Sequence, residues 1–176
     1  MKDLATFLDY FDKVRARTMR VAAVIPEEAF ETSPIGSGFT FGDLLRHLAG
    51  IEREMYAENA AGRQSLYSGH DAVRGKAETL AHVARLHDEA MAIFRSIGDE
   101  GMLRPCTTPG GATMATWKWL RLMIEHEAHH RGQIYTYLQV LGIPAPPLYG
   151  LTSEEVKERS VGPSGVPGSQ PGTTTG

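Results

Sequence analysis

The residues best suited to chemistry are two histidines one helical turn apart, His126 and His130. At about 3.6 residues per turn, positions i and i+4 project from the same side of a helix. The surrounding run, about 113–141, is apolar-periodic, so we expect one amphipathic helix with both imidazoles on its inward face. The side chains that share this face are Trp119, Leu122, Met123, Gln133, Tyr137 and Leu141.

An inward pair of neutral imidazoles is one of the simplest metal-chelating arrangements that a helix offers. The alternative is a structural pair, because buried imidazoles can also be satisfied by hydrogen bonds in a core. A third histidine on a facing helix would favour the metal, and His47 is the best candidate. It lies at the edge of an apolar stripe formed by Phe41, Leu44, Leu48, Ile51 and Met55. Three imidazoles would leave an open coordination position, which is typical of a reactive metal site.

Two further residues are predicted to support this site. Glu54 falls nearly in line with His47, two turns along, and we expect it to serve as a fourth ligand or as an acceptor for an imidazole N–H. Gln133 lies on the inward face, where it would donate to a ligand or orient an imidazole. The remaining candidates, His70, His82 and His87, are predicted to take no part in chemistry.

Four long amphipathic segments must position these side chains. Thr40 is a good N-cap for the second segment, because Asp43 three residues later completes an approximate capping box. Glycines at the segment ends and the absence of convincing strand alternation favour an all-α fold, a four-helix bundle. Short extra helical turns are expected after Pro26 and from Ser153 to Arg159. The four long helices are predicted at about 3–24, 40–60, 71–97 and 113–141.

Length and composition predict one globular domain with a substantial core. The chain has 176 residues and a formal net charge of −3, with no basic block, no apolar run of membrane-spanning length and no signal-peptide pattern. We therefore expect a cytoplasmic protein that binds neither nucleic acid nor membrane. Arg15, Arg17 and Arg20 are assigned to a solvated helix face, and the single Cys106 to an incidental thiol in a loop. The predicted division is a bundle over 1–160 and a flexible Gly/Pro/Ser/Thr-rich tail over 161–176.

A histidine in the second helix (LLRHL, residues 44–48) followed much later by HEAHHRGQ (residues 126–133) resembles the DinB/YfiT superfamily. The resemblance extends from the first helix to the helix end at Gly142-Ile143-Pro144. It implies an up-down-down-up four-helix bundle, commonly a homodimer, with a divalent metal ion on His47, His126 and His130. Family members include metal-dependent hydrolases and enzymes that use low-molecular-weight thiols, such as thiol transferases and a mycothiol-dependent isomerase.

The resulting hypothesis is a metal-dependent enzyme that transfers a thiol to, or hydrolyses, a small-molecule substrate. Zinc and nickel are the foremost metals, with iron and manganese as alternatives, because all accept imidazole ligands. A second hypothesis is a non-catalytic metal-binding or ligand-binding bundle related to stress. A third follows from His126-Glu127-x-x-His130, which satisfies the HExxH pattern of zinc peptidases, although the extended peptidase motif is missing. In the bundle interpretation Glu127 is an ordinary flank residue.

Overall fold

The computed structural model describes residues 2–69 and 72–161, and it is mostly helical. The chain begins with α1 (Leu4–Ala23) and a short 3₁₀ turn, η1 (Glu27–Ala29). A continuous helical rod follows, made of α2 (Phe41–Gly50), the π-helix η2 (Ile51–Ala57) and α3 (Glu58–Ala60). The chain then forms α4 (Lys76–Leu103), a hairpin of β1 (Pro105–Thr107) and β2 (Thr113–Ala115), α5 (Thr116–Val140) and α6 (Ser153–Val161).

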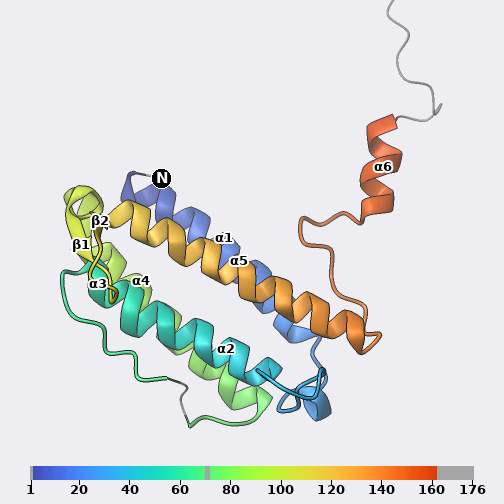
Figure 1. The fold of residues 1–176 in the computed structure, drawn as a ribbon. Helices are drawn as coiled ribbons and strands as arrows, with labels where there is room; N and C mark the ends of the chain where they lie inside the picture. The colour runs from blue at the N-terminus through green and yellow to red at the C-terminus, as the bar shows by residue number, and fades with distance from the viewer. Residues whose placement is uncertain (1, 70–71, 162–176) are drawn as a thin grey trace, which may run out of the picture. The chain divides into compact units, whose positions relative to one another are not determined.

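Four helical rods form the bundle, in the up-down-down-up order that the family resemblance implied (Figure 1). The rod from α2 to α3 runs opposite to α1. The connection over 61–75 then returns along the bundle, so that α4 runs parallel to α2 and packs beside it. The antiparallel β1–β2 hairpin, with Cys106 opposite Met114, reverses the chain again and sets α5 alongside α1.

The core consists of two apolar clusters that follow one another along the bundle. One cluster includes Phe7, Phe94 and Leu120, and the other includes Val21, Leu44 and Leu138. On several helices, the residues that lie between the members of the two clusters have buried polar side chains. These are Arg15 and Thr18 of α1, Glu52 of η2, and Glu127, His130 and Arg131 of α5. The bundle therefore has a polar layer at mid-height, where its chemistry is concentrated.

The predicted helices are present, with differences at their ends. The capping box at Thr40 is confirmed, since Thr40 Oγ1 accepts from the Asp43 amide at 3.0 Å and the Asp43 carboxylate accepts from the Thr40 amide at 3.1 Å. The third long helix begins at Lys76 instead of position 71, and Gly98, with φ 65°, interrupts it before a last turn to Leu103. At the start of α6, Thr152 makes capping contacts with Glu155.

The π-helix η2 shifts the buried face of the second rod by one position. The sequence predicted Ile51 and Met55 in the buried stripe, but Glu52 and Tyr56 are the buried residues and Ile51 and Met55 are only partly buried. A π-turn closes i→i+5 hydrogen bonds and so adds about one residue to a turn. The α-helical period that was assumed for residues 51–57 was therefore wrong. The short hairpin was also not predicted.

By packing, the described residues up to Ala145 form one compact unit, and those from Pro146 on, which include α6, form a second. The predicted tail begins at Val161, the last residue of α6, and its remaining positions lie outside the described residues, as does His70. Within the described part of the chain, no helix is both long and apolar enough to cross a membrane.

Candidate metal centre

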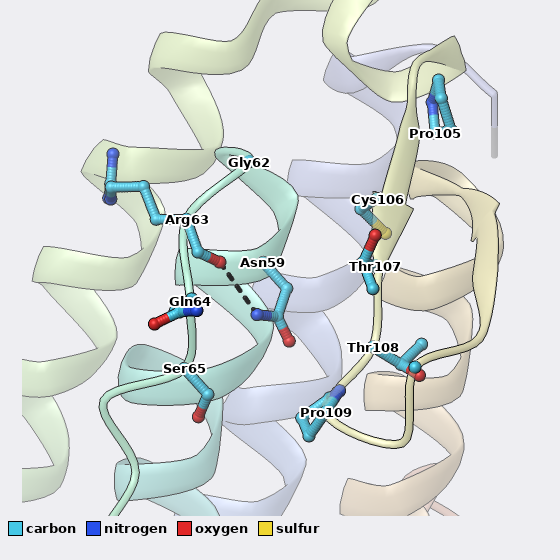
Figure 2. A pocket seen from close by; sticks show the side chains of 11 residues that line it. Asn59, Gly62, Arg63, Gln64, Ser65, Pro105, Cys106, Thr107, Thr108 and Pro109 are labelled. Atoms are coloured by element: carbon cyan, nitrogen blue, oxygen red, sulfur yellow. Dashed lines mark hydrogen bonds between the residues drawn. The ribbon is translucent and has the colours of Figure 1, made fainter.

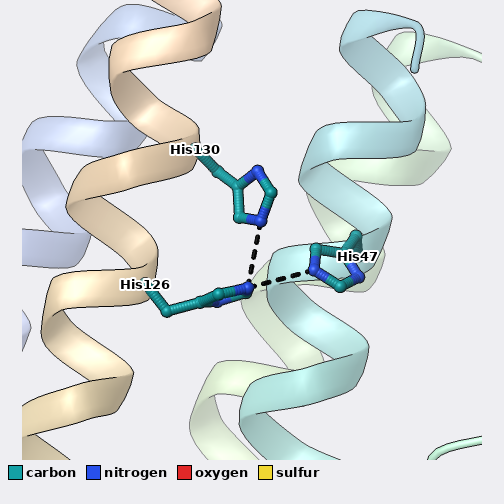
Figure 3. A group of neighbouring side chains, drawn as sticks. All are labelled: His47, His126 and His130. Atoms are coloured by element: carbon teal, nitrogen blue, oxygen red, sulfur yellow. Dashed lines mark hydrogen bonds between the residues drawn. The ribbon is translucent and has the colours of Figure 1, made fainter. Parts of the chain in front are cut away.

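Three imidazoles meet in the polar layer, His47 from α2 and both His126 and His130 from α5 (Figure 3). The Nε2 atom of His126 lies 3.2 Å from Nε2 of His47 and 3.0 Å from Nε2 of His130. The nearest ligand atoms of all three residues lie within 4.8 Å of one another. The structure thus brings together the three histidines that the sequence singled out, with the same ring nitrogen of each directed at the others.

His130 is oriented by Gln133, one turn further along α5. The Nδ1 atom of His130 lies 2.6 Å from Oε1 of Gln133. A carbonyl oxygen can only accept, so Nδ1 carries the proton and donates it to Gln133. Neutral imidazole has one N–H, and Nε2 of His130 consequently presents a lone pair toward His126. Two roles were predicted for Gln133, donating to a ligand and orienting an imidazole, and its contact with His130 matches the second.

His47 is held by two aromatic residues. The Tyr67 hydroxyl lies 2.8 Å from Nδ1 of His47, and the Phe39 ring stacks on the imidazole with centroids 5.9 Å apart and planes 18° apart. Tyr67 belongs to the connection before α4, and the sequence interpretation missed it. The one available signal was an aromatic residue in a mostly polar segment, and that signal does not identify the residue it contacts.

The site favours neutral imidazoles. Burial lowers the pKa of His126, and the neighbouring His130, His47 and His129 act in the same direction, so that together they bring it to about 4. Burial also lowers the pKa of His130, against the opposing effect of Gln133. Deprotonated nitrogen is the form that binds metals, so at neutral pH these two residues are in their ligand state.

The donor set fits a divalent cation. Imidazole nitrogens bound to one ion at about 2.1 Å and at angles near 90–110° lie about 2.9–3.4 Å apart. Two of the three separations between ligand atoms, 3.0 and 3.2 Å from Nε2 of His126, fall in this range, and all three atoms lie within 4.8 Å of one another. The lone pair of His130 already points at this meeting place, and close lone pairs repel one another unless a proton or a cation lies between them.

Glu54 does not join the group of ligand atoms that the three histidines form within the described chain. The in-line placement of Glu54 and His47 assumed an α-helix, whereas residues 51–57 form a π-helix with about one more residue per turn. The backbone carbonyl of Glu54 accepts hydrogen bonds from the Leu66 amide at 2.7 Å and from the Ser65 hydroxyl at 3.3 Å.

A second polar cluster lies on another face of α5, and it corrects two predictions. Arg15 was assigned to a solvated face, and Glu127 to an ordinary flank, yet they are only 5% and 2% exposed. Arg15 bonds to Glu52 and lies 3.1 Å from the Glu127 carboxylate. The burial of the Arg15 guanidinium disfavours its charge, but Glu127 and Glu52 outweigh it and raise the pKa of Arg15.

Thr18 and His87 make further contacts with the two carboxylates of this cluster. The Thr18 hydroxyl donates to Glu127 at 2.6 Å, and Nδ1 of His87 lies 2.8 Å from the Glu52 carboxylate. Because Glu127 is bonded to Arg15 and Thr18 of α1, its carboxylate is turned away from the three histidines. This geometry does not favour the peptidase hypothesis, in which that glutamate would act as a general base beside the metal.

A hollow of about 650 Å³ lies between the connection after α3 and the β1–β2 hairpin (Figure 2). Asn59, Ser65 and Cys106 are among the residues that line it, and none of the three histidines is. Burial raises the pKa of the Cys106 thiol, which keeps it protonated and weakly nucleophilic. Cys106 therefore has the character of the incidental thiol that was predicted, although it is buried in β1.

Comparison with known proteins places this geometry in context. The model of the DinB family matches residues 1–164. A DinB-like protein from Bacillus subtilis, YjoA, superposes with a TM-score of 0.68 at 18% identity, covering 82% of this chain and 97% of that one. YfiT from Bacillus subtilis, described as a probable metal-dependent hydrolase with an unusual four-helix bundle topology, gives a TM-score of 0.63 at 17% identity over 80% and 89% of the two chains. No curated protein matches the sequence.

Proposed function

This chain belongs to the DinB family, and we propose that it is a metal-dependent enzyme that acts on a small molecule. The observation that carries the proposal is the meeting of three Nε2 atoms, from His47, His126 and His130, in the polar layer of the bundle. The description of YfiT as a probable metal-dependent hydrolase on the same fold supports it.

In this proposal the three histidines bind one divalent ion, with zinc or nickel foremost and iron or manganese as alternatives. A cation on three neutral imidazoles supplies Lewis acidity with a coordination position open to a substrate. Gln133 holds the proton of His130 on Nδ1, and the Tyr67 hydroxyl and the Phe39 ring fix the plane of His47. Pre-set ring planes reduce the cost of assembling the ligands around the ion.

The reaction proposed is hydrolysis, or transfer of a low-molecular-weight thiol, on an electrophilic small molecule. Turnover with a panel of thiols and electrophiles, measured with the metal-loaded and the metal-free protein, tests it. Activity is expected only in the loaded protein. Equal activity without metal would remove the proposed mechanism.

The metal itself is tested by elemental analysis of protein purified without chelator. We expect about one divalent ion per chain in the wild type and almost none in His47→Ala. His82→Ala is the matched control, because His82 lies on α4 and bonds to Arg85 outside the cluster, and it should retain the metal. Equal metal content in the wild type and His47→Ala would refute the assignment.

A non-catalytic role is the second candidate, and the placement of the ligands on two packed helices favours it. An ion shared by α2 and α5 would cross-link the bundle, which is how a structural metal acts. Chelation separates the alternatives. Loss of the folded state on removal of the metal would indicate a structural ion, whereas an intact bundle that loses turnover would indicate a catalytic one.

We also propose that the protein is a homodimer, as members of this family commonly are. Trp117 of α5 packs partly against the core and has the Lys2 ammonium 5.7 Å from its ring centroid. Light scattering at micromolar concentration is expected to give twice the mass of one chain. A monomer mass would contradict the proposal.

A further inference from the structure

We propose that Tyr67 is a positioning residue for the metal centre, fixing both the plane and the tautomer of His47. The proposal rests on the proposed function, since it concerns a residue that prepares His47 to bind an ion. Tyr67 lies outside the three-histidine group and touches it only through the far nitrogen of one ring. Its hydroxyl is 2.8 Å from Nδ1 of His47, and the two rings meet edge to face with centroids 5.8 Å apart and planes 70° apart.

Nε2 of His47 faces His126, so binding an ion through it requires the His47 proton on Nδ1, where the Tyr67 hydroxyl, which can donate or accept, lies within reach to accept it. A neutral imidazole carries one proton, on either nitrogen, and the partner of one nitrogen determines the state of the other. When Nδ1–H donates to the Tyr67 oxygen, Nε2 is left with the lone pair that faces His126. Gln133 does the same for His130, so two of the three ligands have an acceptor behind them.

The chain holds Tyr67 in place through an anchored connection. The Tyr67 amide donates to the Ser65 hydroxyl at 3.2 Å, and that hydroxyl donates in turn to the Glu54 carbonyl at 3.3 Å. The Leu66 amide donates to the same carbonyl at 2.7 Å. Tyr67 is therefore tied to the rod whose preceding segment carries His47.

The start of the connection is anchored as well. The Asn59 side chain donates from Nδ2 to the Arg63 carbonyl at 3.0 Å, across the turn that ends α3 (Figure 2). The Arg63 amide donates to the Glu58 carbonyl at 2.9 Å. Because both ends of this stretch are bonded to the helical rod, the path of the chain from Ala61 to Tyr67 is defined by specific contacts.

Gly50 makes the approach of the tyrosine ring feasible. It lies one turn after His47 in α2, and a Cβ atom added there would be 3.2 Å from Cε2 of Tyr67, closer than an ordinary contact. Glycine weakens a helix interior, so its presence here is explained by the space it leaves for the ring. The sequence thus provides the hydroxyl of Tyr67 and, at Gly50, the space for the Tyr67 ring.

The test compares zinc binding by wild type, Tyr67→Phe and Tyr10→Phe, using competition with a chromogenic chelator. Tyr67→Phe is expected to bind zinc about tenfold more weakly, as other losses of an outer partner of a ligating histidine do. Tyr10→Phe, which removes a hydroxyl from a 43% exposed tyrosine on α1, should bind as the wild type does. Circular dichroism of each variant checks that the helices are retained.

Nitrogen NMR of the metal-free proteins reports which ring nitrogen of His47 is protonated. This would not change in Tyr67→Phe if Tyr67 had only a structural role. The His47 ring is expected to be protonated on Nδ1 in the wild type and to redistribute its proton toward Nε2 in Tyr67→Phe. Gly50→Ala keeps the hydroxyl but crowds the ring, so it should weaken zinc binding by a smaller factor. In the double variant Gly50→Ala with Tyr67→Phe, no loss beyond that of Tyr67→Phe is expected.

The outcomes separate this inference from the proposed function. A wild type that binds none of zinc, nickel, iron and manganese would overturn both. A wild type that binds zinc, together with a Tyr67→Phe variant of equal affinity and unchanged His47 tautomer, would overturn only the role of Tyr67. Weaker binding and a shifted tautomer in Tyr67→Phe alone would support it.

Discussion

Adjacent residues of α5 build two polar clusters that differ in their chemistry. His126 and His130 face His47 of α2, whereas their neighbours Glu127 and Arg131 face α1. In the α1-facing cluster, opposite charges meet, and Arg15 lies between two carboxylates. In the histidine cluster, three basic nitrogens meet with no carboxylate in the group of ligand atoms among the described residues.

The difference indicates which cluster balances its own charge. A buried guanidinium between two carboxylates balances its charge within the protein and is expected to hold helices together. Close imidazole nitrogens share no opposite charge, so a proton or a cation must lie among them. The first cluster is therefore expected to matter for folding, and the second for ligand binding. Substitutions in each can test this contrast.

The largest effect is expected from Arg15→Met, which leaves the buried carboxylates of Glu52 and Glu127 without their cation. Breaking a buried ion pair in this way costs about 3–5 kcal/mol of stability. Urea unfolding monitored by circular dichroism measures it. Arg20→Met, an exposed arginine on the same helix, should change stability by less than about 0.5 kcal/mol. Similar losses in both variants would show that the buried cluster has no special role.

The second prediction concerns Gln133→Leu, which removes the acceptor of His130 Nδ1–H. Zinc affinity should fall about 10- to 100-fold, because the ring loses the partner that fixes its tautomer. Stability of the metal-free protein should change much less than in Arg15→Met. Isothermal titration with zinc gives the affinity, and Gln139→Leu, at an exposed position of α5, is the control. Unchanged zinc affinity in Gln133→Leu would refute the orienting role.

The smallest effect is a pH dependence of the metal-free protein. The pKa of His126 is about 4 in the folded chain against an ordinary value of 6.5. Between these values the unfolded chain binds more protons, so stability should decline as the pH falls from 6.5 to 4, by on the order of 1–2 kcal/mol after solvent screening. Unfolding at several pH values should show a shallower decline for His126→Ala than for His82→Ala. Parallel declines would contradict the low pKa.

Much of the fold could be predicted because it follows from local patterns. The periodicity of apolar residues locates the four helices, and the Thr40 and Asp43 pair marks a helix start that the structure reproduces. The His126 and His130 pair is equally local, since i,i+4 spacing alone puts both rings on one face. These features need no knowledge of distant parts of the chain.

What could not be predicted depends on partners far away in sequence. Arg15 is buried because Glu52 and Glu127 neutralise it, and neither lies near it in the chain. By composition alone, a charged residue belongs on the surface. The π-helix breaks the assumed period between His47 and Glu54 without any proline or glycine to announce it within residues 51–57. Tyr67 reaches His47 only because a connection of irregular structure folds back on its helix.

The central claim is that His47, His126 and His130 bind one divalent ion through their Nε2 atoms. Anomalous diffraction at the zinc edge, from crystals of the zinc-loaded protein, tests it most directly. The account predicts one strong peak about 2.0–2.1 Å from all three Nε2 atoms. A loaded crystal with no peak among the three rings, or with zinc bound only elsewhere, would contradict it.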